Sequence, residues 1–520
     1  MNLASDMEAR AIEGPERVGL IYQDGREYTY RQMNEASCAI ANYLKSQGVG
    51  PGDRVGVYMQ NTPTFLFTIF GIWKTGGVLV PVNIMYQAEE LIHAFSSTHV
   101  TTVITDTNGL ERILAIRDTL KAIMVSGCTK IPEDQGIIDF DRQVSAHRQE
   151  FETFVPGEED VAAILFTGGT TGAPKAVITN HHGWYKALCD LAGGHTGSGA
   201  MHPMADTRIP PNMVAMPLFH GGGQQSMLFA YHIGRAVLLL ERFKVANYLS
   251  LAKQYNVRSL VLMPTMIHDI VNYDGPVDLS HVKTVTSIGQ ELRPLLRTQF
   301  EEKFNIPILL NYGSTEVGHV AGWGVKDLKN GLWKPGSVGR LYPGVVLEIR
   351  GEQGTPMPAG EIGEIYVRSK VTTKGYAGNA EESKSLLHDG WVCTGDMGRL
   401  DADGVLFING RKREMIKCGG FQVWPLEIEK VLMKHPKISD VAVIGVPDDR
   451  LGEIPKAFII LKAKVSPKYS EDLKKEIINY CRDNLAHFKA IRAIAFVTAF
   501  PRADTGKILK DQLKRQSITE

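Results

Sequence analysis

A short glycine-rich stretch, FTGGTTGAPK at residues 166–175, combines residue types that bind phosphate. Glycine lets successive backbone N–H groups turn toward one anion, threonine hydroxyls add donors, and Lys175 adds a positive charge. The spacing differs from the common nucleotide loop G-x-x-x-x-G-K-[ST], because Ala173 and Pro174 separate the last glycine from the lysine. A tight surface turn uses the same residue types, so composition alone leaves both interpretations open. The flanking runs VAAILF and AVIT are typical of buried strands, which favours a binding site.

A second polar stretch, NYGSTE at residues 311–316, follows another apolar run. Glu316 has the carboxylate oxygens that Mg²⁺ prefers as ligands. The same letters also fit the start of a helix, with Ser314 or Thr315 as the N-cap and the glutamate in the first turn. Taken alone, the stretch leaves both interpretations open.

Three further stretches place one functional side chain beside glycines. TGDMG holds Asp396, which could accept hydrogen bonds from ribose hydroxyls or sit in an ordinary β-turn. PLFHGGG holds His220 ahead of three glycines, which suggests that something bulky approaches the backbone there. PRADTGK ends at Lys507, for which a solvated surface position is the simplest interpretation.

The elements that must position these residues alternate between strand-like and helical segments, with a buried helix expected at 64–73 and a helix from Ala88. Strands are expected at 53–59, 78–82, 101–106, 236–241, 259–264, 284–289 and 308–313. This alternation predicts α/β layers with largely parallel strands, whose ligands bind at the carboxyl ends of the strands. Three loops fall at such ends: 166–175, the turn after Gly289 and the turn after Tyr312.

The pattern changes after about residue 335, where short glycine-broken runs predict antiparallel strands. The final segment alternates strand-like runs with amphipathic helices and could form a small α+β domain. The polar break at 409–411 is the best boundary, which gives domains 1–410 and 411–520. The second segment holds 22 basic and 14 acidic residues. Because it has no long basic run, the phosphates of a ligand or plain solvation explain this surplus better than nucleic acid or an acidic lipid surface.

The overall composition describes a soluble globular enzyme of more than one domain: 520 residues, 43% hydrophobic and 22% charged. Basic and acidic residues both number 57, so net charge predicts no nucleic-acid partner. The six cysteines include no C-x-x-C pair, which argues against a disulfide framework and a zinc site and favours a reducing, cytoplasmic location. We expect no signal peptide and no transmembrane segment.

Taken in order, these motifs resemble the adenylate-forming superfamily, which includes acyl-CoA synthetases, firefly luciferase and peptide-synthetase adenylation domains. The resemblance covers nearly the whole chain, from KTGGVLVPVN through FTGGTTGAPKAV, PLFHGGG, NYGSTE, TGDMG and GRKREMIKCGGFQVWPLEIE to PRADTGKILK. It implies a large N-terminal domain of layered α/β subdomains plus a β-rich subdomain, and a small mobile α+β C-terminal domain. It also implies two steps: a carboxylate attacks the α-phosphate of Mg-ATP to give acyl-AMP and pyrophosphate, and a thiol then displaces AMP.

The resemblance assigns roles for the first step. Lys507 would bridge carboxylate and phosphate, Glu316 would hold Mg²⁺, Thr315 would reach the α-phosphate, and His220 would lie beside the carboxylate. The pyrophosphate loop would comprise Thr167, Gly168, Gly169, Thr170, Thr171, Gly172 and Lys175. The nucleoside would contact Gly289, Gln290, Glu291, Asn311, Tyr312, Gly313, Ser314, Asp396 and Arg411. The acid would contact His220, Gly221, Gly222, Gly223, Gln224 and Ser287, near Trp184.

For the second step the resemblance assigns Lys417, Gly419 and Gly420 to the thiol path, and a hinge near Arg413. That hinge position is usually Asp or Lys in the family, and both Gly289-Gln290 and Ala176 also depart from its usual pattern, although no catalytic group is lost. ATP, Mg²⁺ and coenzyme A are therefore the expected ligands.

We expect an acid–CoA ligase for a monocarboxylic acid of medium length or with a ring. Gln224 stands near where some long-chain relatives carry a gating tryptophan, and three glycines favour a roomy pocket. The alternatives are an adenylation enzyme that loads a carrier protein, a luciferase-type oxygenase, and a non-catalytic nucleotide-binding protein, which would be expected to lack Lys507 or Glu316. The sequence leaves open whether the chain forms a homodimer.

Overall fold

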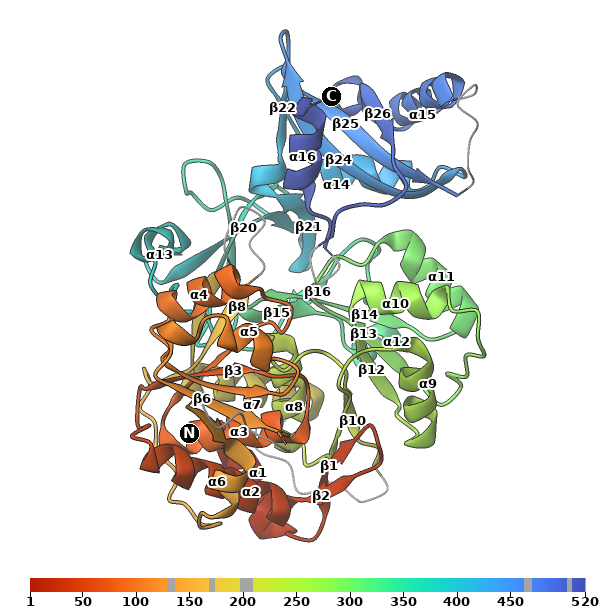
Figure 1. The fold of residues 1–520 in the computed structure, drawn as a ribbon. Coiled ribbons are helices and arrows are strands. Elements are labelled where there is room, and N and C mark those ends of the chain that lie inside the picture. The colour runs from red at the N-terminus through yellow and green to blue at the C-terminus, as the bar shows by residue number, and fades with distance from the viewer. Residues whose placement is uncertain (129–135, 168–173, 197–208, 463–469, 503–506, 520) are drawn as a thin grey trace.

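The computed structural model describes residues 1–128, 136–167, 174–196, 209–462, 470–502 and 507–519. The chain folds into several layers of helices and sheets, with the residues from β22 onward forming a separate body above the rest (Figure 1). This arrangement is the predicted one, a large α/β and β-rich part followed by a small α+β part. No helix within the described ranges is long and apolar enough to cross a membrane.

The first sheet has seven strands and is parallel except for its last pair, β8 and β9. Its order is β7 (Ile137–Asp139), β6 (Ala122–Ser126), β5 (Thr102–Asp106), β3 (Arg54–Tyr58), β4 (Val78–Pro81), β8 (Val161–Thr167) and β9 (Lys175–Asn180). A second, four-stranded sheet has the order β10 (Asn212–Val214), β11 (Val237–Leu239), β1 (Val18–Tyr22) and β2 (Glu27–Thr29).

Helix α3 (Pro63–Thr75) shows why the longest apolar run folds inside the protein. The Thr62 side chain accepts from the backbone N–H of Phe65, proline occupies the first turn, and Gly76 ends the helix at a φ of 79°. The helix is apolar on nearly all sides because it packs between α2 (Tyr30–Ser46) and the sheet, and all its residues except Thr64 are buried.

The third sheet runs through the middle of the molecule and is parallel at one end and antiparallel at the other. Its order is β12 (Ser259–Leu262), β13 (Thr284–Ser287), β14 (Ile308–Ser314), β15 (Gly318–Gly322), β16 (Gly339–Leu341), β21 (Val405–Arg411), β20 (Trp391–Leu400), β18 (Gly363–Arg368) and β17 (Val346–Arg350), with β19 (Leu387–His388) on β20. The apolar runs predicted at 259–264, 284–289 and 308–313 form its parallel end.

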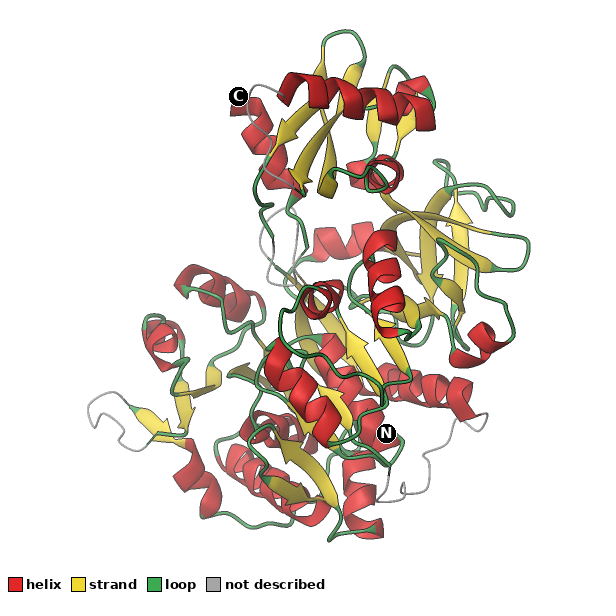
Figure 2. Ribbon diagram, turned by 90° about the vertical axis from the view of Figure 1, so that its right-hand side faces the viewer, coloured by secondary structure: helices red, strands yellow, loops and turns green. Residues whose placement is uncertain are grey.

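Helices cover the faces of these sheets (Figure 2). Along the chain most of them lie between successive strands, as the alternation of patterns predicts. They are α1 (Ser5–Glu13), α4 (Ala88–Ser97), α5 (Leu110–Leu114), α6 (Phe140–Ser145), α7 (His181–Thr196), α8 (Gly221–His232), α9 (Val245–Gln254), α10 (Pro264–Val271), α11 (Pro294–Phe304), α12 (Val325–Lys329) and α13 (Ala380–Leu386).

The small C-terminal body has its own sheet and its own core. The sheet order is β23 (Phe421–Val423), β22 (Ile416–Cys418), β25 (Gly452–Leu461) and β24 (Ile438–Asp448), with β26 (Ala493–Phe496) on β25. Helices α14 (Pro425–Leu432), α15 (Ser470–Asn484) and α16 (Lys510–Thr519) pack against it (Figure 1).

The chain passes from the large body to the small one just after β21, through a single turn of 3₁₀-helix at 412–414. On the large side, Lys412 Nζ lies 2.6 Å from Glu364 Oε2. On the small side, Glu414 Oε2 lies 2.9 Å from Nζ of Lys510, which also binds Glu429 at 2.8 Å. Arg413 is therefore the residue between two anchored neighbours.

Candidate active site

The glycine-rich stretch lies, along the chain, between the antiparallel strands β8 and β9. Residues 168–173, with Gly168, Gly169, Thr170, Thr171 and Gly172, lie outside the described residues. The two ends are described: Thr167 and Lys175 are directly opposite one another in the strand register. Lys175 Nζ lies 3.2 Å from Glu382 Oε1 and 5.1 Å from the centre of the Tyr376 ring, so its charge already has partners at the mouth of the loop.

Glu316 lies in the turn of a second β-hairpin, between β14 and β15. The helix-start interpretation of NYGSTE is therefore wrong: Gly318, at a φ of 68°, lets the chain reverse and pair with β14. Gly313 is required there because a Cβ on it would lie 2.1 Å from the Gly318 carbonyl oxygen. The Tyr376 hydroxyl donates to Glu316 Oε1 over 3.2 Å, which leaves further carboxylate lone pairs facing the turn.

Asp396 lies in the middle of β20, opposite Arg411 on β21, so the β-turn interpretation is wrong as well. Its Oδ1 atom is 2.6 Å from Arg411 Nε, and its Oδ2 atom accepts from the Tyr312 hydroxyl over 2.7 Å. The side chain is buried, and burial raises the pKa of Asp396 while the Arg411 charge opposes that rise. Three side chains that are far apart in sequence thus form one polar cluster.

Lys507 lies close enough to this cluster for its charge to interact with Asp396 and Arg411. Burial lowers the pKa of Lys507, and the neighbouring guanidinium of Arg411 lowers it further. The solvated interpretation is therefore wrong, because the side chain is half-buried between the two bodies of the protein. A cation held there suits an oxyanion or a phosphate.

The residues expected around the adenine come from two neighbouring parallel strands. Gly289, at a φ of 84°, follows β13, and Gln290 comes next. Glu291 Oε1 instead lies 3.2 Å from Nζ of Lys430 on α14, so this carboxylate joins the two bodies. On β14, the Asn311 amide donates to the Tyr342 hydroxyl over 2.9 Å.

The neighbouring polar residues of β14 are held by the same hairpin. His319 Nδ1 lies 3.1 Å from Asn311 Oδ1, and burial lowers the pKa of this histidine to about 4, so the neutral ring donates to the amide oxygen. Ser314 ends the strand and Thr315 begins the turn, both half-buried. The hairpin therefore fixes the Asn311 amide between Tyr342 and His319, and it places two hydroxyl-bearing residues directly before Glu316 in the chain.

The residues expected around the acid lie at the start of α8, where His220 is the N-cap residue. A Cβ on Gly221 would contact Leu165 at 3.4 Å and Trp184 at 3.9 Å, and one on Gly222 would contact Ile288 and Met216 at 3.5 and 3.6 Å. Both glycines therefore border apolar side chains.

Gly223 has a different role, because its Cβ would lie 2.2 Å from the Pro217 carbonyl oxygen. This glycine is needed for the fold of the turn, so only two of the three glycines can widen a pocket. Gln224 and Ser287 are buried, and Gln224 Nε2 donates to the Leu218 carbonyl over 2.8 Å. Gln224 Oε1 and Ser287 Oγ have no hydrogen-bond partner among the described residues.

Lys417, Gly419 and Gly420 are not brought to this cluster. They lie on the exposed hairpin of β22 and β23, which Figure 1 shows at the upper side of the small body. Gly419 and Gly420 have φ values of 58° and 85°, as the tight turn requires. Among the described residues, no ion pair or hydrogen bond joins these three to Asp396, Tyr312 or Lys507.

Sequence reasoning missed Tyr376, which contacts both Glu316 and Lys175, and also His319 and Lys430. Tyr376 lies in the stretch TTKGYAGN, whose two glycines beside an aromatic residue were the available signal. Among the described residues, no group of three or more His, Cys, Asp or Glu side chains could hold a metal ion by itself.

Comparison with known proteins covers the whole length of the chain. The model of the AMP-binding enzyme family matches residues 7–377, and that of the AMP-binding enzyme C-terminal domain matches residues 427–507. Crotonobetaine/carnitine–CoA ligase of Salmonella typhimurium is 31% identical over an alignment of 508 residues, and the match covers 94% of this chain and 93% of that protein.

Two solved structures superpose on nearly the full chain. The anthranilate CoA ligase AuaEII in complex with anthranoyl-AMP has a TM-score of 0.87 and 27% identity, over 100% of this chain and 98% of its own. The fatty acyl CoA synthetase of Mycobacterium tuberculosis has a TM-score of 0.74 and 27% identity, over 100% and 99% of the two chains.

Proposed function

The chain belongs to the family of AMP-binding enzymes, and we propose that it is an AMP-forming acid–CoA ligase. The observation that carries this proposal is the cluster of Asp396, Arg411 and Tyr312 with Lys507 beside it. It combines a carboxylate for ribose hydroxyls with a half-buried cation for a phosphate. The named relatives, which join acids to coenzyme A, support the same reaction.

In the first step a carboxylate oxygen of the acid bonds to the α-phosphorus of ATP, and the bond from that phosphorus to the pyrophosphate oxygen breaks. Two anions must approach one another, so Lys507 between them lowers the barrier electrostatically. Thr167 and Lys175, with the loop that they bracket, are proposed to hold the leaving pyrophosphate. Asp396 retains free lone pairs for the ribose hydroxyls, because each of its oxygens accepts one bond.

A magnesium ion fits the side chain of Glu316, a single carboxylate at the mouth of the phosphate loop whose oxygens are only partly engaged. Mg²⁺ commonly takes one or two protein carboxylates and completes its shell with phosphate oxygens and water. The ion would neutralise charge on the phosphates. Tyr376 orients the carboxylate for that purpose.

In the second step the sulfur of coenzyme A attacks the acyl carbon, and AMP leaves with the bonding electron pair. We place the domain boundary at 410–411 and the hinge at Arg413, the residue between the two anchored neighbours. A rotation there would exchange Lys507 for the hairpin of Lys417, Gly419 and Gly420. The basic surplus of residues 411–520 suits the phosphates of coenzyme A.

For the acid we propose a monocarboxylate of medium length or with a ring. The side chains that Gly221 and Gly222 border are apolar: Leu165, Trp184, Met216 and Ile288. Such surroundings favour a hydrophobic body over a second charge. The free thiols of all six cysteines support our proposal of a reducing compartment such as the cytoplasm.

The decisive experiment measures pyrophosphate release across a panel of aliphatic, aromatic and alicyclic acids, with and without coenzyme A. A ligase forms acyl-CoA and free AMP stoichiometrically when the thiol is added. Product formation with a phosphopantetheinylated carrier protein but not with coenzyme A would identify the carrier-loading reaction instead. Absence of acid-dependent pyrophosphate release would contradict both.

A pair of glycine variants tests the acid pocket on the same panel. Gly222→Trp adds bulk beside Ile288 and Met216 and is expected to exclude the larger acids while sparing the small ones. Gly223→Ala, by contrast, is expected to lower the melting temperature, because its Cβ would collide with the Pro217 carbonyl. An unchanged acid preference in Gly222→Trp would remove Gly222 from the pocket.

A further inference from the structure

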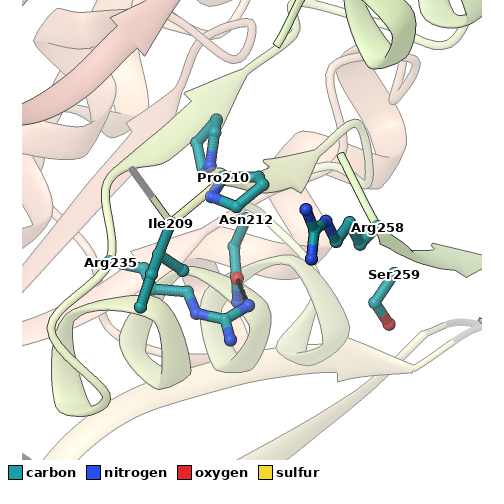
Figure 3. A pocket seen from close by; sticks show the side chains of 7 residues that line it. Ile209, Pro210, Asn212, Arg235, Arg258 and Ser259 are labelled. Atoms are coloured by element: carbon teal, nitrogen blue, oxygen red, sulfur yellow. Dashed lines mark hydrogen bonds between the residues drawn. The ribbon is translucent and has the colours of Figure 1, made fainter. Parts of the chain in front are cut away.

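A pocket of about 280 Å³ lies on the edge of the molecule away from the carboxyl ends of the strands. It is lined by Ile209, Pro210, Pro211, Asn212, Arg235, Arg258 and Ser259 (Figure 3). Asn212 and Ser259 begin β10 and β12, and Arg235 comes shortly before β11. Because β12 runs parallel to β13 and β14, the pocket and the proposed adenylation site lie at opposite ends of the same strands.

The pocket concentrates positive charge, and none of the described residues that line it carries a carboxylate. Its lining holds two guanidinium groups, and neither forms an ion pair with any described residue. The side chain of Arg235 makes one long bond, 3.5 Å from Nη1 to Asn212 Oδ1, although a guanidinium carries five N–H donors. Burial lowers the pKa of Arg235, which reflects the cost of holding that charge away from water.

The second arginine of the pocket, Arg258, is exposed and adds a second positive charge to the lining. Arg258 lies immediately before β12, and Figure 3 shows its guanidinium on the opposite side of Asn212 from that of Arg235. Two like charges that share one concavity repel each other, and an anion between them would relieve this repulsion.

Two neutral donors and an apolar wall define what kind of anion fits. The Ser259 hydroxyl accepts from Thr284 over 3.2 Å, so its own proton can point into the pocket, and the Asn212 amide nitrogen can donate beside it. Ile209, Pro210 and Pro211 form an apolar flank. Arginine pairs match the oxygens of a phosphate, and the apolar surface of Ile209, Pro210 and Pro211 suits a base or another ring.

We propose that this pocket is a second ligand site, which binds an organic phosphate with its phosphate between Arg235 and Arg258 and its ring against the Ile209–Pro211 wall. The site is separate from the adenylation centre, and its ligand chemistry is that of a phosphate ester. A 5′-phosphate such as that of AMP and the 3′-phosphate of coenzyme A share this chemistry. Binding here adds one nucleotide per chain to the one in the adenylation site.

Equilibrium dialysis with labelled AMP tests the proposal on the full chain. We expect two AMP molecules per chain in the wild type and one in the double variant Arg235→Gln/Arg258→Gln. The double variant lacks both guanidinium groups and therefore their hydrogen bonds to the phosphate of the second AMP. Arg258→Gln alone changes an exposed side chain and keeps the fold, and it is expected to weaken the second site about tenfold or more. Arg482→Gln, on exposed α15, makes the same charge change without an effect on binding.

Two further arms separate this site from the adenylation site and from simple charge attraction. Asp396→Ala is expected to lose the adenylation nucleotide and keep the second one. AMP should bind the second site at least tenfold more tightly than inorganic phosphate. Displacement of labelled AMP by coenzyme A then shows whether the site prefers the 3′-phosphate of coenzyme A or the 5′-phosphate of AMP.

One AMP per chain in the wild type, or second-site binding unchanged in the double arginine variant, would overturn the proposal. Equal affinity for AMP and inorganic phosphate would overturn the organic-phosphate class. A protein that binds a second AMP but releases no pyrophosphate with any acid would leave this inference standing and refute the proposed function instead.

Discussion

The two sides of the small C-terminal body differ in what surrounds their lysines. On the side toward the large body, Lys430 pairs with Glu291, Lys507 is half-buried beside Asp396, and Asp440 pairs with Arg293. On the exposed hairpin, the backbone N–H of Lys417 donates to Glu453 over 3.0 Å, and no described residue forms an ion pair with its side chain. One set of charges is thus held against a partner surface, while the other faces solvent. The difference supports separate roles for the two sides in a two-step reaction.

The largest effect is expected from Lys507→Ala. Removal of the cation between carboxylate and phosphate should slow acyl-AMP formation about 10²- to 10³-fold, the loss typical of a missing oxyanion contact. ATP–pyrophosphate exchange measures it. Lys417→Ala changes a lysine of the exposed hairpin and should retain the exchange. Equal losses of exchange in both variants would contradict the assignment of the two sides.

The second effect concerns the exposed hairpin itself. Gly420→Leu should slow the transfer of the acyl group from acyl-AMP to coenzyme A about 100-fold, because a displaced thiol would no longer be aligned with the acyl carbon. A single-turnover experiment loads the enzyme with acid and ATP and then follows acyl-AMP decay after coenzyme A is added. Because Gly420 has a φ of 85°, Gly420→Ala serves as the control for backbone strain. Decay at the wild-type rate in the leucine variant would remove the hairpin from the thiol path.

The third prediction sharpens the role of the large body. Glu316→Gln should lower magnesium-dependent turnover by about 10- to 100-fold, because an amide is a poorer ligand for Mg²⁺ than a carboxylate. Tyr376→Phe removes only the hydroxyl that orients the carboxylate, a bond of about 1 kcal/mol. A magnesium titration of the exchange rate distinguishes the two. A glutamine variant that loses melting temperature but keeps its magnesium response would make Glu316 a purely structural residue.

The smallest effect is expected from Lys430→Met. The ion pair with Glu291 is half-exposed and worth at most about 1 kcal/mol. Its loss should slow the first step by no more than about fivefold. The transfer to coenzyme A should stay the same or become faster, because the lost pair joins the two bodies in the arrangement that we propose for adenylation. A slower transfer step in this variant would show that Lys430 serves both steps.

Much of the fold followed from short-range patterns. Apolar runs of strand length predicted β3, β4, β5, β12, β13 and β14, because a strand buried on both faces needs apolar side chains along its length. Helix α3 was predicted for the same reason, since an apolar run too short for a membrane must be buried in the core.

The site was predicted less completely, because its contacts join distant parts of the chain. The Tyr376–Glu316 bond spans 60 residues, and the Lys430–Glu291 pair joins the two bodies. No local pattern contains such a pair. The β-turn alternative for Asp396 was wrong because its segment pairs with β21 in a sheet. The helix-start alternative for Glu316 was wrong because the preceding strand, β14, pairs with β15.

The anchors on either side of Arg413 have a geometric consequence. Lys412 is tied to Glu364 of the large body, and Glu414 is tied to Lys510 of the small one. A rotation of the small body would then occur about the backbone φ and ψ bonds of a single residue, Arg413. Groups close to Arg413, such as Glu414, would move only a short distance, whereas the hairpin at Gly420 would move a long one. The exchange of Lys507 for the hairpin of Lys417, Gly419 and Gly420 would therefore require a large torsional change at Arg413.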